Sequence, residues 1–170
     1  VHLLLHAGAN PNTLDQWNYT PLMYAVLYHD PAVVQQLTYI LLQGGCDVNF
    51  GATLDNDNEV NGNMTLPDLS ESCEVQYATY VREPQGPTSG TALHLAIQNP
   101  DLPNEYIETL LSAGASVNAR NLCGQTPIMG AIIDSYYEYS SNVRSHVDLL
   151  LKHNVEINAV DRRGWSAMHY

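Results

Sequence analysis

The sequence has few basic residues. Six lysines and arginines stand against 18 aspartates and glutamates, which gives a formal net charge of −12. Nucleic-acid-binding proteins need a basic surface that releases counterions from phosphates, so this shortage argues against nucleic acid as a ligand. No apolar run approaches the roughly 18–20 residues that a membrane-spanning helix requires, and the N-terminus lacks the pattern of a signal peptide. We therefore expect no contact with nucleic acid and no membrane segment.

Cysteines and catalytic motifs are also scarce. Cys46, Cys73 and Cys123 are odd in number and lack a C-x-x-C spacing, which fits a reducing compartment better than a disulfide framework. We expect an intracellular protein, in the cytoplasm or the nucleus. The G-x-G-x-x-G, P-loop and G-x-S-x-G motifs are missing from the sequence. We therefore predict no enzyme activity, no catalytic residues and no cofactor.

Two patterns contain metal-ligating residue types, and we interpret neither as a metal site. Residues 57–68 carry oxygen side chains at alternate positions, as a calcium loop does, but Glu59 and Asp68 depart from that pattern and no helical pattern flanks it. His2 and His6 are four residues apart, yet no third ligand lies nearby in the sequence. We predict a solvated acidic loop and a chance pair of histidines.

A short pattern recurs along the chain. In residues 110–128, LLSAGASVNARNLCGQTPI, one helix ends at Gly114, an extended turn follows, and a second helix begins at Thr126 and Pro127. Recurrence at a nearly fixed period predicts a repeat array rather than one globular core. The recurring positions are Thr20, Thr91, Thr126 and Ser166 at the helix cap, Leu41–Leu42, Leu110–Leu111 and Leu150–Leu151 near the end of the second helix, and Asn12, Asn49, Asn118 and Asn158 at the end of each unit.

This order of residues resembles the ankyrin repeat family, whose unit reads D-x-x-G-x-T-P-L-H-x-A and then a second helix that ends in L-L-x-x-G-A-x-x-N. The resemblance covers the chain except for about residues 50–87. It implies an all-α fold, an ankyrin-repeat solenoid of helix-turn-helix units with short hairpin loops and one long acidic insertion. The implied single domain spans 1–170, with partial units at 1–14 and 161–170, full units at 15–51, 86–120 and 121–160, and the insertion loop at 52–86. We expect the chain to be part of a longer protein.

Two departures from the family pattern lead to predictions. The family's histidine is kept at His94 and His169, whereas Met23 and Met129 stand at the same place in other units. We predict that these two units lose a side-chain hydrogen bond and gain apolar packing. The unit that opens at Thr126 is longer than the family's, and we place its extra residues between the two helices, around 135–142.

The insertion at 52–86 holds seven acidic residues and one arginine, so it carries half of the net charge. Residues 54–63 are rich in Asp and Asn and look disordered, whereas residues 75–81 alternate with the period of a strand. One interpretation is a partner-specific or regulated arm. The other, which we favour, is a tolerated surface loop, because long insertions cost little closure entropy.

Stacked helix pairs leave hairpin tips and first-helix faces as one concave surface. The resemblance implies a non-enzymatic protein–protein interaction module, a scaffold or adaptor whose protein partner presents a basic or mixed-charge segment. Two alternatives stay open: a substrate- or partner-recruiting segment of a larger multidomain enzyme or ubiquitin-ligase adaptor, and a structural spacer. For Trp17 and Tyr19, partner contact and packing on the adjacent hairpin are both open. The residues that match the family's contact positions are Gln16, Trp17, Tyr19, Leu27, Tyr28, Gln98, Asn99, Leu122, Gln125, Ile133, Asp134, Arg162, Arg163 and Trp165.

The unit-ending asparagines suggest a modification. In the ankyrin family such residues are substrates of an asparagine hydroxylase, which favours an asparagine that follows Val or Ile. Asn49, Asn118 and Asn158 each meet this condition. The resemblance therefore implies these three residues as hydroxylation sites.

Overall fold

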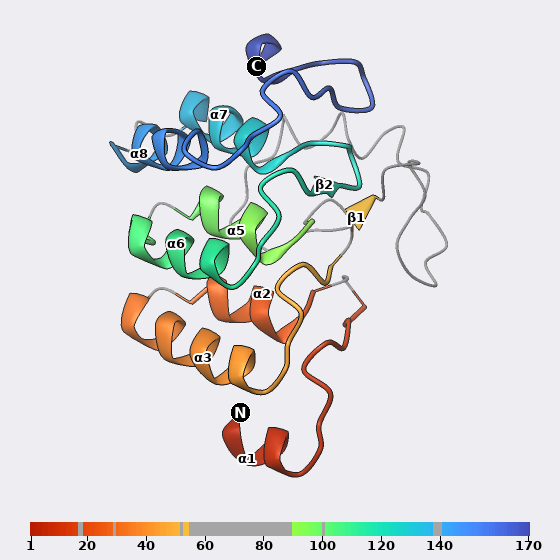
Figure 1. The fold of residues 1–170 in the computed structure, drawn as a ribbon, viewed down its shortest axis with the longest axis vertical. Coiled ribbons are helices and arrows are strands. Elements are labelled where there is room, and N and C mark those ends of the chain that lie inside the picture. Colours follow the sequence, from red (N-terminus) through yellow and green to blue (C-terminus); the bar gives the residue numbers. More distant parts are fainter. Residues whose placement is uncertain (17–18, 29, 52, 55–89, 100, 138–140) are drawn as a thin grey trace.

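The chain folds into a stack of helix pairs (Figure 1). The structure is a computed structural model that describes residues 1–16, 19–28, 30–51, 53–54, 90–99, 101–137 and 141–170, without the side chains of 53–54, 134–137 and 141–143. The pairs are α2 (Pro21–Val26) with α3 (Pro31–Gln43), α5 (Ala92–Gln98) with α6 (Asn104–Ser112), and α7 (Pro127–Tyr137) with α8 (Ser141–Leu150). The short helix α1 (His2–His6) lies at one end of the stack, and the 3-10 helix η1 (Ala167–His169) lies at the other.

The helices begin where their caps predict. The Thr20 hydroxyl accepts the N–H of Met23 at 3.1 Å, and Pro21 occupies the first position of α2, where it needs no N–H partner. In the same way Oδ1 of Asp30 accepts the N–H of Ala32 at 2.9 Å before α3. Helices α5 and α7 start directly after Thr91 and Thr126. The predicted starts after Thr20, Thr91 and Thr126 are therefore confirmed.

Glycines follow the second helices where the chain must turn sharply. Gly45 and Gly114 follow α3 and α6 with φ of +82° and +93°. A side chain disfavours this left-handed conformation, so glycine is the residue that ends these helices with least strain.

The core runs through the stack from layer to layer. The first helices contact one another in the order α2, α5, α7, and the second helices α6 and α8 are also in contact. Each layer buries its apolar stripe against its neighbours, as expected for a repeat array. The largest buried apolar side chains of this core are Leu22, Met23, Leu93, Ile97, Leu102, Ile107, Leu110, Ile128, Met129 and Leu150.

Hairpin loops project from the stack on the side opposite α3, α6 and α8 (Figure 1). We call them fingers. Strand β1 (Thr53–Leu54) pairs antiparallel with β2 (Arg120–Asn121), with Thr53 opposite Asn121. A bridge between Val160 and Ser166 closes the last finger, residues 159–166. The pairing of β1 with β2 links Thr53 and Leu54 to the third finger, residues 119–126.

The longer unit differs from the prediction in one respect. Helix α7 has 11 residues, whereas α2 has 6 and α5 has 7. Part of the extra length therefore extends the first helix and does not lie in a loop. The strand-like pattern at 75–81 and the calcium-like pattern at 57–68 lie outside the described residues.

Candidate functional site

The first helices place four of the expected contact residues on one surface, which we call the groove floor. Leu27 and Tyr28 directly follow α2, and Tyr28 is 55% exposed. Gln98, in the next layer, is exposed, and Ile133, in α7, is half-buried. Leu27, Gln98 and Ile133 each lie seven positions after a capping threonine. Because α2, α5 and α7 are neighbours, these residues form a row across the layers.

Asn99 lies eight positions after Thr91, as Tyr28 lies eight positions after Thr20, but its side chain makes hydrogen bonds within the fold. Its side-chain amide donates to the carbonyl of Val26 at 2.9 Å, and its Oδ1 accepts the N–H of Asp101 at 3.0 Å. The side chain therefore ties α5 to α2. The side chain of Asp134, at the equivalent place in α7, lies outside the described residues.

Two expected contact residues of the fingers are buried, which corrects the prediction for them. Tyr19 is 5% exposed, and its ring lies 5.6 Å from that of Tyr24. Leu122 is fully buried. Tyr19 belongs to the hydrophobic core of the stack. Gln16 is exposed, and Trp17 lies outside the described residues.

Gln125 is half-buried and joins the third finger to the end of the chain. Its Nε2 donates to the hydroxyl of Tyr170 at 2.9 Å, and its Oε1 accepts from Nδ2 of Asn121 at 3.0 Å. Like Asn99, it lies at an expected contact position and its amide group serves the fold.

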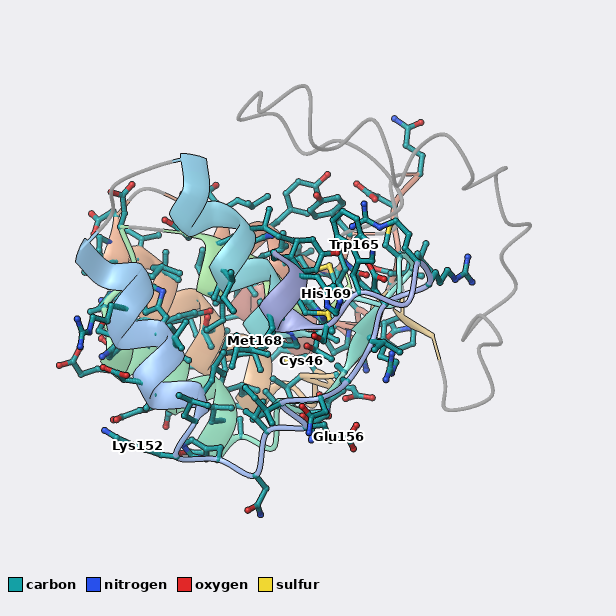
Figure 2. All side chains as sticks on the ribbon, turned by 90° about the horizontal axis from the view of Figure 1, so that it is seen from above. Cys46, Lys152, Glu156, Trp165, Met168 and His169 are labelled. Atoms are coloured by element: carbon teal, nitrogen blue, oxygen red, sulfur yellow. The ribbon has the colours of Figure 1, made fainter. Side chains whose placement is uncertain are left out.

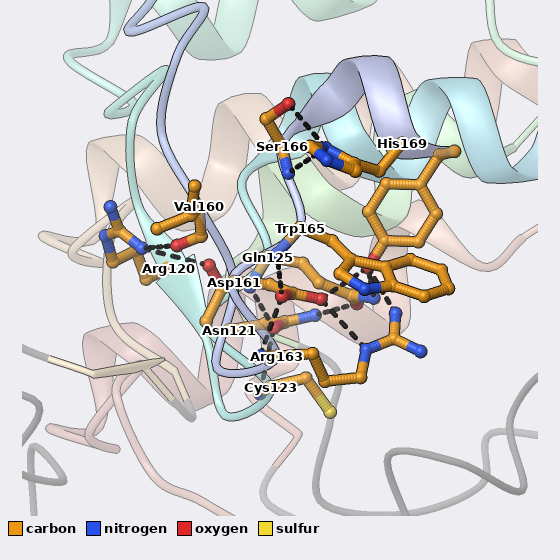
Figure 3. Close-up of polar contacts among 12 residues, drawn as sticks. Arg120, Asn121, Cys123, Gln125, Val160, Asp161, Arg163, Trp165, Ser166 and His169 are labelled. Atoms are coloured by element: carbon orange, nitrogen blue, oxygen red, sulfur yellow. Dashed lines mark hydrogen bonds and ion pairs between the residues drawn. The ribbon is translucent and has the colours of Figure 1, made fainter.

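Asp161 organises the last finger (Figure 3). Its Oδ1 accepts the backbone N–H groups of Arg163 at 2.8 Å and Trp165 at 2.9 Å. Its Oδ2 accepts the hydroxyl of Tyr170 at 2.6 Å and Nε of Arg163 at 3.2 Å. Burial alone would raise the pKa of this carboxyl, but the hydrogen bonds from Tyr170, Trp165 and Arg163 outweigh it and lower the pKa.

The exposed side of this finger is basic and aromatic. The guanidinium carbon of Arg163 lies 4.2 Å from the centre of the Trp165 ring, within the range of a cation–π contact. Trp165 is 39% exposed, and Arg162 is exposed. Arg162, Arg163 and Trp165 therefore lie together, as expected for residues of one hairpin tip.

His94 is a buried structural histidine. Its Nδ1 accepts the backbone N–H of Thr91 at 3.1 Å, so its Nε2 carries the proton and donates to the carbonyl of Gln125 at 3.1 Å. Burial lowers the pKa of His94 to about 4, although hydrogen bonds to carbonyls favour the charged form. The side chain thus joins α5 to the third finger.

The methionines at the equivalent place match the prediction only in part. In the unit of Met23 the predicted loss of a side-chain hydrogen bond is wrong, because Sδ of Met23 accepts the backbone N–H of Thr20 at 3.5 Å. Met23 is 0% exposed and Met129 is 1% exposed, so both add apolar packing. The hydroxyl of Thr126 is buried and has no hydrogen-bond partner among the described residues. The counterpart hydroxyl of Thr91 lies 3.0 Å from Nδ1 of His94. The loss of a side-chain hydrogen bond is therefore confirmed in the unit of Met129.

The unit-ending asparagines fasten each layer to the next, and we call these contacts staples. Asn49 donates to the carbonyl of Gly114 at 2.9 Å and accepts the N–H of Ser116 at 2.7 Å. Asn118 makes the same pair of bonds with Asn154 at 3.1 Å and Glu156 at 2.9 Å. Asn158 is exposed, and its amide has no hydrogen-bond partner within the described part of the chain.

The same staple occurs at the first junction. Asn12 donates from Nδ2 to the carbonyl of Gly45 at 3.4 Å and accepts the N–H of Asp47 at 2.7 Å. Of the three asparagines proposed as hydroxylation sites, Asn49 and Asn118 are therefore engaged in the stack, and Asn158 differs from them.

Sequence reasoning missed several polar contacts. The hydroxyls of Tyr24 and Tyr170 donate to Oδ2 of Asp15 and Asp161. Each tyrosine follows its aspartate by nine residues, a repeated spacing that could have indicated the contact. A buried bond of 2.8 Å between the hydroxyls of Thr38 and Tyr106 had no such signal, because 68 residues separate them.

The described cysteines differ from one another. Cys46 is a half-buried free thiol whose pKa is raised to about 11 by burial and by the neighbouring Asp47. Cys123 is disulfide-bonded, so the expectation of reduced cysteines is wrong at this residue.

The described residues form neither a metal-ligand cluster nor a membrane-spanning helix. No group of three His, Cys, Asp or Glu side chains in this part of the chain is arranged to hold a metal ion. None of the helices in the described ranges is both long and apolar enough to cross a membrane.

Comparison with known proteins agrees with this architecture. Residues 93–170 match the family described as Ankyrin repeats (3 copies). The whole chain is similar to the B-cell lymphoma 3 protein homolog of Mus musculus, with 27% identity over 170 residues, which are 99% of this chain and 28% of that protein. A stretch of 72 residues, 42% of the chain, is 36% identical to the transcription factor MBP1 of Saccharomyces cerevisiae and covers 8% of it.

Residues 93–170 therefore carry ankyrin repeats, and the stacked helix pairs of the described residues have the fold of an ankyrin-repeat solenoid. Ankyrin repeats are protein–protein interaction modules. The chain spans only 28% and 8% of the lengths of the two relatives. The activities of those whole proteins are therefore not transferred to it.

Proposed function

We propose that this chain is a non-enzymatic scaffold or adaptor that binds a partner polypeptide along the groove floor. The observation that carries the proposal is the row formed by Leu27, Tyr28, Gln98 and Ile133 on neighbouring first helices. Tyr28 is the most suitable anchor, because a tyrosine combines a large apolar ring with a polar hydroxyl and often dominates interface energetics.

The staples and the His94 bonds support the same proposal. They join successive layers through bonds that need no partner, so the row of contact residues is held in place before binding. A preorganised surface loses less conformational entropy when it binds.

The charge of the chain suggests the chemistry of the partner. A net charge of −12 attracts basic or mixed-charge polypeptides and speeds their association. We propose that the partner contributes such a segment. Seven of the acidic residues belong to the insertion and lie outside the described residues. The charge that we propose for the partner segment is therefore inferred from the sequence.

A matched pair of tyrosines tests the groove. Tyr28 and Tyr39 are 55% and 64% exposed, but Tyr39 lies on the second helix α3, away from the groove floor. A photo-crosslinking amino acid at position 28 is expected to trap a partner from cell extract, and Tyr28→Ala is expected to reduce capture of that same partner at least about tenfold. Position 39 is expected to trap none of it. Equal trapping from both positions would contradict the proposal.

The alternative is a recruiting segment of a larger multidomain enzyme or ubiquitin-ligase adaptor. The observation that favours it is the greater length of both relatives. Sequencing of the complete transcript would decide between the two, because an encoded catalytic or ligase-binding domain supports the alternative. A structural spacer, the third interpretation, predicts that no groove substitution changes any interaction.

We also propose an intracellular location, in the cytoplasm or the nucleus. One relative carries the name of a transcription factor, which supports it. The disulfide of Cys123 counts against it, because reducing compartments disfavour disulfides. Fractionation of cells that express the complete protein tests the location.

Hydroxylation of Asn49, Asn118 and Asn158 is a further part of the proposal. Asn158 is exposed, whereas Asn49 and Asn118 are half-buried and stapled to the next layer. Peptide mass spectrometry of protein from oxygenated cells measures the extent at each site. Unmodified asparagine at all three positions would contradict this part.

A further inference from the structure

The last two fingers carry a charge opposite to that of the chain. Arg120, Arg162 and Arg163 are three of the five lysines and arginines in the described part of the chain. The two fingers, residues 119–126 and 159–166, contain a single acidic residue, Asp161. The side chain of Asp161 is only 1% exposed. Its charge is already paired with Arg163 at 3.2 Å. The charge that these fingers present to solvent is therefore positive.

The two fingers are fixed to each other. Arg120 donates from Nη1 to the carbonyl of Val160 at 2.6 Å and to that of Gly124 at 3.2 Å. The N–H of Arg162 donates to the carbonyl of Cys123 at 3.0 Å (Figure 3 shows the Arg120 contacts). These bonds hold the backbone at Arg162 at a defined position, while its side chain extends from it into solvent.

An aromatic cluster lies in the same finger as Arg162 and in the helix η1 that follows it, and Trp165 stands three residues after Arg162 in the sequence. The Trp165 ring meets the Tyr170 ring edge to face at 5.7 Å and stacks with the His169 ring at 6.5 Å. Figure 2 shows Trp165, His169 and Met168 together at one end of the stack, and Met168 is 90% exposed. An exposed tryptophan next to an arginine is a combination enriched at the anchors of protein interfaces.

We propose that the last finger, through Arg162 and Trp165, is a docking site for an acidic segment of the partner polypeptide. A glutamate or aspartate of that segment pairs with the Arg162 guanidinium, and an adjacent apolar or aromatic side chain packs on Trp165. The inference rests on the proposed function and adds the partner's orientation: its basic part lies on the acidic remainder of this chain, and its acidic part lies at the last finger.

The charge complementarity makes an acidic segment the favoured occupant. Arginine pairs with carboxylates through a planar fork of donors, and a basic partner would meet like charge at Arg162. The site also lies apart from the tyrosine of the groove floor, since Tyr28 follows α2 near the other end of the stack (Figure 1).

Binding of a synthetic peptide tests the site on the complete 170-residue chain. The probe is a fluorescein-labelled peptide of alternating glutamate and tyrosine, with a glutamine-for-glutamate peptide as its control. The glutamate peptide is expected to bind at low salt, and Arg162→Glu is expected to weaken binding about tenfold, the order of one lost charge-assisted hydrogen bond. Lys152→Glu makes the same charge change at an exposed residue beyond α8 and is expected to alter binding less than about twofold.

A second measurement locates the peptide. The indole N–H resonance of Trp165, assigned by its loss in Trp165→Phe, is expected to shift when the glutamate peptide is added. Equal weakening by Arg162→Glu and Lys152→Glu would show attraction to net charge alone and overturn the inference. A Trp165 resonance that does not shift, or glutamate and glutamine peptides that bind equally, would also overturn it. If the peptide binds only after residues 55–86 are removed, the chain's own acidic residues occupy the finger, and the partner assignment fails.

The proposed function is tested by an experiment that is independent of the finger site. Its readout is the crosslink at position 28, which does not depend on the peptide or on Arg162. A partner trapped from position 28 and captured less by Tyr28→Ala, together with unchanged peptide binding in Arg162→Glu, would reject only the finger site.

Discussion

The hydroxyl of Tyr170 lies 2.6 Å from Oδ2 of Asp161, and this bond joins the start of a first helix to the finger that precedes it. Asp15 and Tyr24 make the same bond near the other end of the stack. Of the two units between, the one that opens at Thr126 has Gly130 where the tyrosine would be, and its Gln125 reaches the hydroxyl of Tyr170 instead. One hydroxyl therefore connects two fingers.

Removal of that hydroxyl should loosen the last finger. We expect Tyr170→Phe to lower the free energy of unfolding by about 1–2 kcal/mol, because the buried carboxylate of Asp161 loses a donor. Urea denaturation followed by circular dichroism measures the change. Tyr39→Phe is the control, since the Tyr39 side chain is 64% exposed and should change stability by less than about 0.5 kcal/mol. Equal stabilities of the two variants would contradict this role of Tyr170.

The capping threonines Thr91 and Thr126 should respond differently to the same substitution. The Thr91 hydroxyl lies 3.0 Å from Nδ1 of His94, whereas that of Thr126 is buried without a described partner. We expect Thr91→Val to destabilise the chain by about 1–2 kcal/mol and Thr126→Val to be neutral or stabilising, because it removes an unsatisfied hydroxyl. Chemical denaturation of both variants checks the order. A larger loss for Thr126→Val would show that its hydroxyl has a partner after all.

Stability should fall as the solution is acidified below pH 6.5. The pKa of His94 is about 4 in the folded chain, against an ordinary value of 6.5, so the unfolded chain binds more protons between these values. His94 therefore contributes stability above pH 6.5 that is lost progressively toward pH 4. The expected loss from this residue is about 2 kcal/mol at pH 5. His146, whose pKa is also lowered by burial, changes stability in the same direction.

A substitution isolates the His94 contribution. His94→Met gives this unit the residue that Met23 and Met129 supply elsewhere. Thermal unfolding at a series of pH values should show a weaker pH dependence in this variant between pH 4 and 6.5. An unchanged dependence would assign the effect to other groups.

The staples should contribute to stability only where the next layer receives them. We expect Asn49→Ala and Asn118→Ala each to cost about 1–2 kcal/mol, because each removes two hydrogen bonds between layers. Asn158→Ala is the matched control and should cost less than about 0.5 kcal/mol. Equilibrium unfolding of the three variants provides the comparison, and a cost at Asn158 as large as at Asn118 would refute it.

Local chemistry explains why the helix boundaries could be predicted. Thr20 and Pro21 act within one turn, and the glycine after α6 needs only its own backbone conformation. Such signals are complete within a few residues of sequence. The sequence showed the staples only as recurring asparagines, because their partners lie 33 to 67 residues away.

The contact surface was harder to predict than the fold. The repeat places Leu27, Gln98 and Ile133 in one register, so their common surface follows from the period. The repeat period alone does not show whether neighbouring residues bury a side chain, and Tyr19 and Leu122 are in fact buried. Asn99 and Gln125 lie at predicted contact positions, but their amides bond to other layers.

The staples have a consequence for how such a gene can change. Every one of them is satisfied by the adjoining layer alone, so duplication or excision of a whole helix pair breaks one junction and rebuilds an equivalent one. The number of layers can thus drift between descendants without redesign of the interior.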